Sequence, residues 1–585
     1  MSDALDTRGP ARRRPAAWQV AAVAVYLLAA GWVVWLSRDQ INPDAVAYAR
    51  LAEHYARGRL DLAVASYWGP LLVWLLTPAV WLGVDPILAA KVLGIFLGLL
   101  FALGAADLAG AMRCGPYARW ALAPALLMAL LMLPEPVTPD LLLTCLLTWY
   151  LSATARLLAG PTGPPATTHG GRGPRVRLAL AAGMLGGLAY LAKAYALPFV
   201  ALHLPLTLVL SRVAARCRGP QPARPATLRP LLAGWAGLLL LAGPWIALIS
   251  HRDGRLTFGG ADRLAEPFIV ADKARWQGMP ALRIQQPRQG RTNVWESPSE
   301  IAEELIRPFR LSGEQRTRYR LTAAWNNTGQ TLTILRDVDG LGLLLGGWGL
   351  TLVLACLAFR LPSPHGALCW WSCASTAVFL AGYAALLVEA RYFWPVWGLL
   401  LAMLAHALSV ICGSGRGADS SQAAGRPEGR WRRLRRAAQL GAGVVLFVLL
   451  TSLGQRVWAT VRQWARPGGA GDEFAWVRFA GDNCLAQAGG DCRRTPQQPP
   501  VAANFWHYGL FTCYRRHEVF LGAFDSRDPD QIASELSAYG PTRVFVFDDD
   551  ELADRLRSDR RFLWLAGVRN ASIGRDLNVL EFKPP

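Results

Sequence analysis

Four charged residues of this sequence stand beside apolar segments, where a carboxylate or a basic group could act on a substrate. Asp44 comes eight residues after a long apolar run, and Asp140 stands in the stretch PEPVTPDLLLT between two further runs. Lys193 interrupts the apolar stretch GLAYLAKAYALPF, and Arg391 lies in VEARYFWPVWG. A carboxylate can take a proton from a hydroxyl group, and Lys and Arg hold phosphate through charge-assisted hydrogen bonds. These residue types together favour a site that binds a phosphate and removes a proton.

Five weaker candidates stand near these four in the sequence, and they are Tyr48, Tyr55, Glu135, Glu389 and Tyr392. If residues 44–57 form a helix, Tyr48 and Tyr55 share a stripe with Asp44 at helical spacing. Tyr392 directly follows Arg391 and is a further candidate for phosphate binding. We expect the other four weaker candidates to contact the substrate.

Each of the charged residues also has a structural interpretation. Asp44 and Asp140 could cap the helices that follow them. Lys193 could extend its ammonium group to the lipid headgroups, and Arg391 could simply pair with Glu389. The case for a site depends on whether these residues share one face of the membrane.

Long uncharged runs recur along the chain and define its class. Of the 585 residues, 53% are hydrophobic and 17% are charged, whereas soluble proteins carry about 25% charged residues. Many runs reach the length of about 17 residues that a membrane-spanning helix needs. We therefore predict a polytopic α-helical membrane protein with about 11 transmembrane helices. They are expected near 16–36, 87–110, 118–133, 141–157, 178–193, 195–211, 230–249, 336–359, 366–388, 393–412 and 438–455.

The positive charge of the chain, +20 in all, gathers on one side of the predicted membrane. The segments that are cytoplasmic when the N-terminus is inside hold 23 of the 61 Lys and Arg residues, but four of the 41 Asp and Glu residues. This bias follows the positive-inside rule. It predicts a cytoplasmic N-terminus and argues against nucleic-acid binding. The first run follows Arg12, Arg13 and Arg14 without a small-residue cleavage site, so we expect a retained span rather than a signal peptide.

The run at 67–84, YWGPLLVWLLTPAVWLGV, tests this topology. It is uncharged and long enough to cross, but crossing would move the later arginine-rich loops to the outside, against the positive-inside rule. Its two prolines and three tryptophans suit a helix lying along the membrane surface. We therefore expect a juxtamembrane helix within a first outer loop at 37–86. A long loop at 250–335 and the C-terminal segment 456–585 share this outer face.

Residues 456–585 differ in character from the rest of the chain. They hold 17 basic and 17 acidic residues and no run of membrane-spanning length. Short β-rich pieces such as TRVFVF alternate with helical pieces such as DELADRLRS, which predicts a small α/β domain. We expect this domain to fold by itself and to contribute little to chemistry.

Two further features of this segment suggest specific chemistry. Cys484 and Cys492 flank LAQAGGD and could form a disulfide on an outer face, with Cys513 left over. The run DDDE at 548–551 is better explained by acids at the start of a helix than by a metal site.

The motifs also occur in a recognisable order. A helix with an acid and tyrosines is followed by GPLLVWLLTPAVWLGVDP, by the acid of TPD, by GLAYLAK and by E-x-R-Y-x-x-P. This order, on one side of the membrane, resembles the GT-C superfamily of membrane glycosyltransferases. The nearest branch is that of the protein O-mannosyltransferases and the aminoarabinose transferases of lipid A. The resemblance covers residues 10–412, within a GT-C-like transmembrane domain at 1–455.

The resemblance implies an inverting enzyme that moves a sugar from a polyprenyl-phosphate donor to a hydroxyl acceptor. The acceptor could be a glycan, a lipid or a protein. The reaction would take place on the periplasmic face of a bacterial inner membrane, where the C-terminal domain would also lie.

The resemblance also implies roles for the four strong candidates. Asp44 matches the acid of the first outer loop and would act as the base, and Asp140 matches the acid of the second and would orient Asp44 or the acceptor. Lys193 and Arg391 match basic positions that would hold the lipid phosphate. Family members often carry a second acid directly after the first, whereas this chain has Ala45. A divalent metal therefore remains possible but is not supported, and no cofactor is certain.

Two non-enzymatic functions compete with this hypothesis. A lipid-linked glycan transporter or flippase would need charges at mid-membrane and discontinuous helices, whereas Lys91 and Asp107 stand near the ends of a predicted span. An envelope assembly factor would act through the C-terminal domain, but it leaves the acids beside the membrane unexplained.

Overall fold

The computed structural model describes residues 16–584 except for a set of segments. These are 116, 136, 160–172, 217–227, 261–281, 302, 308–310, 338–348, 350–363, 385–387, 413–427, 467–498 and 571–574. The span predicted near 336–359 and the pair Cys484 and Cys492 lie outside the described residues.

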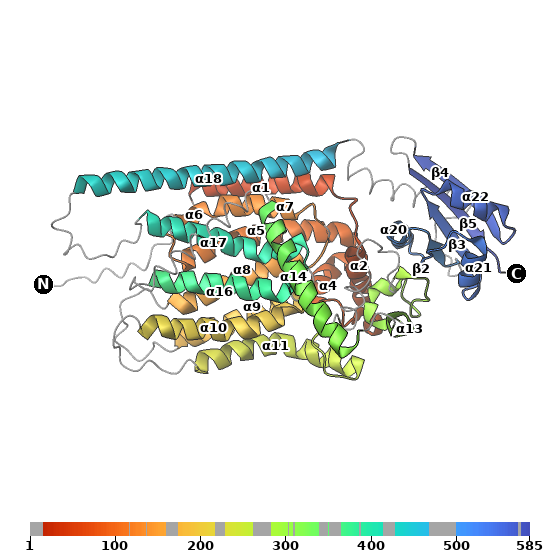
Figure 1. The fold of residues 1–585 in the computed structure, drawn as a ribbon, viewed down its shortest axis with the longest axis horizontal. Helices are drawn as coiled ribbons and strands as arrows, with labels where there is room; N and C mark the ends of the chain where they lie inside the picture. Colours follow the sequence, from red (N-terminus) through yellow and green to blue (C-terminus); the bar gives the residue numbers. More distant parts are fainter. Residues whose placement is uncertain are drawn as a thin grey trace.

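Long apolar helices lie side by side and form the body of the molecule (Figure 1). Within the described ranges, nine helices are long and apolar enough to cross a membrane. They are α1 (Ala17–Leu36), α5 (Pro86–Ala111), α8 (Asp140–Ala159), α9 (Gly173–Ala192), α10 (Ala196–Arg216), α11 (Leu228–Asp253), α16 (Pro364–Ala384), α17 (Trp394–Ile411) and α18 (Glu428–Ala465). They coincide with nine of the predicted spans and confirm the class of polytopic helical membrane protein. In place of the span expected at 118–133, the chain forms two shorter helices, α6 (Tyr117–Trp120) and α7 (Leu122–Met132).

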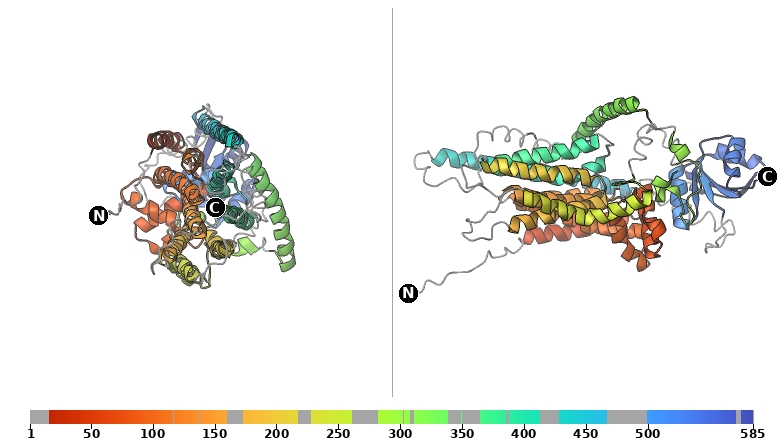
Figure 2. Two further views of the ribbon diagram at one scale, coloured as in Figure 1. Left: turned by 90° about the vertical axis from the view of Figure 1, so that its left-hand side faces the viewer. Right: turned by 90° about the horizontal axis from the view of Figure 1, so that it is seen from below.

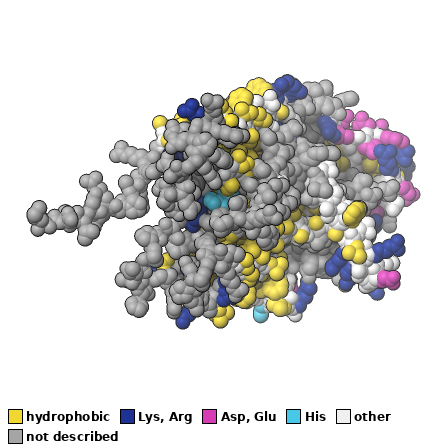
Figure 3. All heavy atoms as spheres, turned by 60° about the vertical axis from the view of Figure 1, so that its left-hand side comes forward, with side chains coloured by type: hydrophobic (Ala, Val, Ile, Leu, Met, Phe, Trp, Pro, Cys, Tyr) yellow, Lys and Arg dark blue, Asp and Glu magenta, His cyan; other side chains and the backbone are white. Residues whose placement is uncertain are grey.

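Apolar side chains cover the middle of the bundle, as expected of a surface that meets lipid tails. Leu28, Phe96 and Leu240 are more than half exposed on three different helices. In Figure 3, hydrophobic side chains form a band across the middle, and acidic side chains gather towards one end.

Glycines bring two of these helices unusually close. Gly183 and Gly187 stand four residues apart on α9 and face Gly234 and Gly237 on α11. A Cβ on Gly183 would overlap the carbonyl group of Gly234, and one on Gly237 would overlap that of Leu180. Small residues at such spacing allow helix backbones to approach inside a membrane. The contact fixes α9, which ends one residue before Lys193.

The first outer loop contains three helices, α2 (Pro43–Ala56), α3 (Leu60–Ala63) and α4 (Pro70–Trp81). The 12 residues of α4 extend about 18 Å, which is shorter than the hydrocarbon core of about 30 Å. The helix lies at the same end of the bundle as α2 (Figure 1). The structure therefore agrees with a juxtamembrane helix at 67–84.

A mixed five-stranded sheet lies beyond that end of the bundle (Figures 1 and 2). Its strands are β1 (Val501–Ala503), β2 (Phe520–Ala523), β3 (Thr542–Phe547), β4 (Phe562–Asn570) and β5 (Arg575–Phe582), in the order β2-β1-β3-β5-β4. The β1 strand pairs in parallel with β2 and β3, and β5 pairs antiparallel with β3 and β4. Helices α20 (Trp506–Arg516), α21 (Pro529–Ser537) and α22 (Asp550–Ser558) accompany the sheet. This arrangement confirms the predicted α/β character.

The acidic run at 548–551 has the structural role that the sequence predicted. The Asp549 carboxylate accepts a hydrogen bond from the backbone N–H of Leu552 at 3.1 Å and so caps α22. Asp550 and Glu551 lie in the first turn of that helix, where negative charge opposes the helix dipole.

The long outer loop joins the sheet to the membrane part. Its described elements are η3 (Val294–Glu296), η4 (Pro298–Glu300), α13 (Glu303–Ile306) and α14 (Gly313–Asp337). Ahead of η3, the N–H of Gln285 donates to the Leu521 carbonyl at 3.0 Å, and the N–H of Phe520 donates to the Thr292 carbonyl at 2.7 Å. The loop thus covers β2, an edge strand that would otherwise leave backbone groups free to pair with another chain.

Helix α2 is fixed to the C-terminal domain through Arg50. The Arg50 guanidinium donates to the Tyr514 carbonyl at 2.8 Å and lies 2.7 Å from His517 Nδ1. It also pairs with Glu53 at 2.9 Å, and both side chains of this pair are buried. Arg50 therefore joins a helix that carries Asp44 to the first helix of the sheet domain.

The Arg50→Ala variant is expected to lower stability strongly, by about 3 kcal/mol or more, because it leaves the Glu53 carboxylate buried with less compensation. Arg57→Ala is the matched control, since Arg57 contacts the same carboxylate at 3.2 Å from a side chain that is 49% exposed. A pair of that kind contributes about 1 kcal/mol or less. Thermal unfolding of both variants in detergent measures the difference. Equal midpoints for the two variants would show that Arg50 does not hold the domains together.

Candidate functional site

The four strong candidate residues meet at one end of the helix bundle. Asp44 lies in α2, and Asp140 is the first residue of α8. Lys193 lies in the turn between α9 and α10, and Arg391 lies in the short helix η7 (Ala390–Phe393). A chain of ion pairs joins all four, although Asp44 and Arg391 are far apart in the sequence. The expectation that they share one face therefore agrees with the structure.

Asp140 and Lys193 form the tightest pair in this cluster. The Lys193 ammonium donates to Asp140 Oδ1 at 2.6 Å, and the Thr138 hydroxyl donates to Asp140 Oδ2 at 2.8 Å. Asp140 is 3% exposed and also faces Arg391 at 3.5 Å. The Asp140 oxygens are therefore bound by Lys193 and Thr138, and the Lys193 ammonium is paired with a carboxylate of the protein. A carboxylate held in this way is better suited to orienting other groups than to accepting a proton.

Arg391 is the centre of the cluster. Its guanidinium lies 2.8 Å from Glu389, 3.4 Å from Asp44 and 3.5 Å from Asp140. The pairing with Glu389 that the sequence suggested is present, but it is one of three. The side chain is 18% exposed, so the guanidinium remains accessible to an anion that competes with these carboxylates.

Asp44 differs from Asp140 in its surroundings. It is the second residue of α2, whereas the N-cap position is held by Asn42, whose side chain makes no capping bond. The helix-cap interpretation of Asp44 is therefore wrong. Its carboxylate forms an ion pair with Arg391 at 3.4 Å. Burial raises the pKa of Asp44 above its usual range, and the Arg391 charge opposes this effect. A carboxylate with a raised pKa and one long ion pair is suited to take a proton.

Tyrosine rings surround Lys193. Its ammonium lies 3.7 Å from the centre of the Tyr392 ring, and that ring stacks on Tyr383 at 4.9 Å. Tyr195 lies 3.9 Å from Tyr383 on the other side. Tyr392 thus contacts the predicted phosphate-binding lysine through its ring face, a favourable cation–π arrangement. Tyr195 and Tyr383 were missed, although Tyr195 stands two residues from Lys193 in the sequence.

A second aromatic group extends from the other side of Asp44. Tyr48 is buried and meets the edge of Trp68 at 5.2 Å, and Trp68 lies 5.9 Å from Trp295 of the long outer loop. Burial, and after it the charge of Asp44, raises the pKa of the Tyr48 hydroxyl. Tyr67 packs on Trp68 at 4.6 Å, and the same causes raise its pKa. Tyr67 was missed because YWG gave no signal beyond that of an interfacial helix.

The two remaining weaker candidates lie at different distances from the ion cluster. Tyr55 is 11 residues beyond Asp44 on the same helix, which is a rise of about 16 Å. Glu135 lies in the turn before α8, where burial raises the pKa of its carboxyl group and the nearby charge of Arg391 opposes this effect.

A metal site is not apparent in the described part of the chain. No group of three or more His, Cys, Asp or Glu side chains is arranged there to hold a metal ion. Ala45, which stands where the related family often has a second acid, is fully buried against the core.

The charges of the cluster do not balance. Asp44, Asp140 and Glu389 carry three negative charges when ionised, and Lys193 and Arg391 carry two positive charges. An incoming phosphate therefore competes with carboxylates for Arg391 and Lys193, because both cations already have anionic partners. Glu389, 38% exposed, and Asp44, which among the described residues has no second cation such as the Lys193 that holds Asp140, are the partners most easily displaced.

Comparison with known proteins identifies the fold. No protein-family model matches the sequence, and no curated protein matches it. Among solved structures, the chain is similar to ArnT from Cupriavidus metallidurans bound to undecaprenyl phosphate, with a TM-score of 0.55 and 16% identity over 96% of this chain and 98% of that one. The apo state of the same protein gives a TM-score of 0.51 and 16% identity over 96% of this chain and 97% of that one. Archaeal oligosaccharyltransferase AglB from Archaeoglobus fulgidus, in complex with an inhibitory peptide and a dolichol-phosphate, gives a TM-score of 0.49 and 12% identity over 92% of this chain and 70% of that one.

The chain therefore has the GT-C fold of membrane glycosyltransferases, as the order of its motifs predicted. The alignment with ArnT spans 96% of this chain, so the likeness includes the C-terminal sheet as well as the helix bundle.

Proposed function

We propose that this protein is an inverting glycosyltransferase that uses a polyprenyl-phosphate sugar as donor and a hydroxyl group as acceptor. The observation that carries the proposal is the cluster of Asp44, Arg391, Asp140 and Lys193 at one end of a GT-C fold. A solved structure with this fold, that of ArnT, holds undecaprenyl phosphate. The acceptor is a glycan, a lipid or a protein of the envelope.

The reaction begins with proton removal. The Asp44 carboxylate accepts the proton of the acceptor hydroxyl while the acceptor oxygen forms a bond to the anomeric carbon. The bond between that carbon and the phosphate oxygen breaks, and its electron pair stays on the phosphate. Attack from the side opposite the phosphate inverts the anomeric configuration. Lys193 and Arg391 stabilise the negative charge that develops on the departing lipid phosphate.

Arg391 couples donor binding to the strength of the base. A phosphate that takes a hydrogen-bonding position on Arg391 competes with Asp44, which is held at 3.4 Å. The opposite charge of Arg391 lowers the pKa of Asp44, so loss of this contact makes the carboxylate a stronger base. The base is thus strongest when the donor is in place.

The remaining residues position these groups. Asp140 holds Lys193 and faces Arg391, and so orients the two cations towards one phosphate. Tyr392 supports the ammonium of Lys193 with its ring. Tyr48 lies beside the base, while Glu389 releases Arg391 to the donor. An extended acceptor would contact Glu135, which lies near Arg391, and Tyr55, which lies farther out.

The proposed setting is the inner membrane of a bacterium. Residues 1–455 form the transmembrane catalytic part, and residues 456–585 form a periplasmic domain. The N-terminus is cytoplasmic, and the outer loops at 37–86 and 250–335 lie on the periplasmic side with the site.

Reporter fusions after residues 60, 290 and 470 are expected to show an external location for all three, since each follows a segment assigned to the periplasmic side. A fusion after residue 165 is the matched control and should report a cytoplasmic location. A cytoplasmic signal at residue 290 would mean that 67–84 crosses the membrane, which would separate Asp44 from Lys193.

The function itself is tested with purified protein in lipid nanodiscs and a panel of polyprenyl-phosphate sugars. The measurement is release of free polyprenyl phosphate that depends on an added hydroxyl acceptor. Movement of the intact donor across the bilayer without release would favour a transporter. The structure offers little for that alternative, because Lys91 bonds Gln40 at 3.1 Å near one end of α5, and Asp107 pairs with Arg156 near the other.

A further inference from the structure

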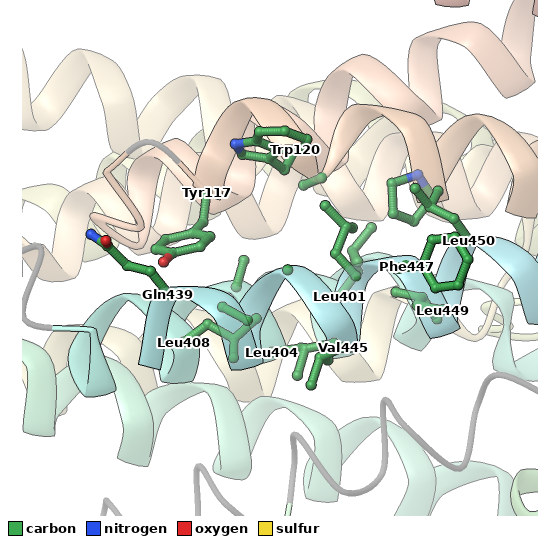
Figure 4. Close-up of a pocket in the computed structure, with 16 residues that line it drawn as sticks. Tyr117, Trp120, Leu401, Leu404, Leu408, Gln439, Val445, Phe447, Leu449 and Leu450 are labelled. Atoms are coloured by element: carbon green, nitrogen blue, oxygen red, sulfur yellow. The ribbon is translucent and has the colours of Figure 1, made fainter. Parts of the chain in front are cut away.

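An apolar groove lies between helices α6, α7, α17 and α18 (Figure 4). Helix α6 lies towards the end of the bundle remote from α2, the helix that carries Asp44 (Figure 1). The volume of the groove is about 540 Å³. Leu401 and Leu404 of α17 and Leu449 of α18 are buried in its lining, while Trp120 and Phe447 are more than half exposed. The groove is therefore open to the surroundings and lined by groups that a lipid tail can contact.

The length of the groove matches one leaflet of a membrane. Along α18 its lining runs from Gln439 to Leu450, a rise of about 16 Å, and half of the hydrocarbon core is about 15 Å thick. The ring of Trp120 stacks with Trp18 at 6.0 Å, and tryptophans gather at the boundary between lipid tails and water. This pair therefore places the end of the groove beside Trp120 at the membrane surface.

The polar end of the groove is also its cationic end. Tyr117 and Gln439 stand together at one end of the lining, and with the indole N–H of Trp120 they supply its hydrogen-bonding side chains (Figure 4). The exposed Arg119 follows Tyr117 by two residues, and the exposed Arg436 precedes Gln439 by three, so Arg436 lies on the same side of α18. Residues 428–436 include five arginines. Basic residues in this position attract anionic lipid headgroups.

We propose that the groove binds an acyl chain of an anionic phospholipid from the leaflet opposite the candidate site, with its headgroup held by Arg119 and Arg436. A polyprenyl-phosphate donor does not suit it, because its phosphate belongs at the opposite end of the bundle with Lys193 and Arg391. The groove would therefore bind a lipid other than the donor, and both lipids could be bound to the chain at the same time. Such a lipid would fix α18 against α7 and α17.

Gly443→Phe tests the groove directly. Gly443 belongs to the lining, and a Cβ there meets no atom within 4 Å, so the added ring occupies the groove without disturbing the packing of the helices. Gly441→Phe is the matched control, because Gly441 is two residues away, exposed, equally free of neighbours and outside the lining. Native mass spectrometry of the purified full chain, titrated with phosphatidylglycerol or with phosphatidylcholine of the same chains, measures lipid binding.

The wild-type chain and Gly441→Phe should bind one phosphatidylglycerol at least tenfold more tightly than phosphatidylcholine, since each basic residue near the headgroup contributes roughly fivefold. Gly443→Phe should lose this binding, and Arg119→Gln with Arg436→Gln should lose the preference for the anionic headgroup. Unchanged binding in Gly443→Phe would overturn the proposal. Displacement of the lipid by equimolar polyprenyl phosphate would also overturn it. A third contrary result would be a dimer of the wild-type chain that forms instead of lipid binding and is absent in Gly443→Phe.

Discussion

The Asp44→Asn variant is expected to transfer sugar at least about 10²-fold more slowly than the wild-type chain, which is the usual scale for loss of a general base. The amide has nearly the same size as the carboxylate but cannot accept the proton. Donor binding should change little, because Lys193 and Arg391 remain. Turnover at saturating donor, measured beside the dissociation constant of the donor, separates these two quantities.

The pH profile of turnover gives a second readout for Asp44. Since burial raises the pKa of this carboxyl group, wild-type activity should fall with decreasing pH at a higher pH than for a free aspartate, and the residual activity of Asp44→Asn should lack that limb. Asp61→Asn is the control, because Asp61 is an exposed acid of the same outer loop. Near-normal transfer by Asp44→Asn would remove Asp44 from the chemistry.

The Arg391→Ala variant is expected to weaken donor binding roughly 10- to 100-fold, because a hydrogen bond to a charged group contributes about 1.5–3 kcal/mol. Turnover of the remaining complex should fall less than in Asp44→Asn. Titration with a polyprenyl-phosphate sugar measures the affinity, and a melting curve shows whether the variant remains folded with three carboxylates left beside one cation.

Arg391→Lys is the control for the charge alone. It keeps a cation but loses the planar fork that can contact two oxygens of a phosphate, so its donor affinity should lie between those of the wild type and Arg391→Ala. Donor affinity that is equal in all three proteins would show that Arg391 only neutralises Asp44, Asp140 and Glu389.

The sequence predicted the site well in one respect and poorly in another. The lengths of the apolar runs and the excess of arginine in the predicted cytoplasmic loops give each charged residue a depth in the membrane. These features place Asp140 and Lys193 at the same level. Depth does not fix the arrangement of helices within the membrane plane. The contact between Lys193 and Asp140 across 53 positions could therefore be anticipated only through the family resemblance.

Residues without charge were harder to anticipate. Tyr383 stands near the end of α16, and Tyr67 stands beside a run of interfacial aromatics. In both places tyrosine is common for reasons of membrane contact alone. Their position near the ion cluster depends on how α16 and the first outer loop pack against other elements, which local sequence does not specify.

The attachment of the outer parts was also beyond the sequence. Charge and hydropathy change sharply between the membrane part and the C-terminal segment, and this change predicts an independent domain. Composition cannot show that Arg50 of the first outer loop donates to the Tyr514 carbonyl, or that residues near Gln285 extend the edge of the sheet. Whether 456–585 folds alone stays a prediction.

The buried polar contacts of Arg50 and His54 determine how precisely α2 positions Asp44. A helix held only by apolar contacts can slide or turn and find new contacts of similar energy. For α2, a shift by one residue turns each side chain by about 100°, which would leave Arg50 without the Tyr514 carbonyl and His54 without Glu296, its partner at 2.9 Å. Glu296 is fully buried on another element, so a shifted register would leave its carboxylate with one partner fewer. We infer that these distant pairs set the register of α2, and thereby the position of Asp44 relative to Arg391.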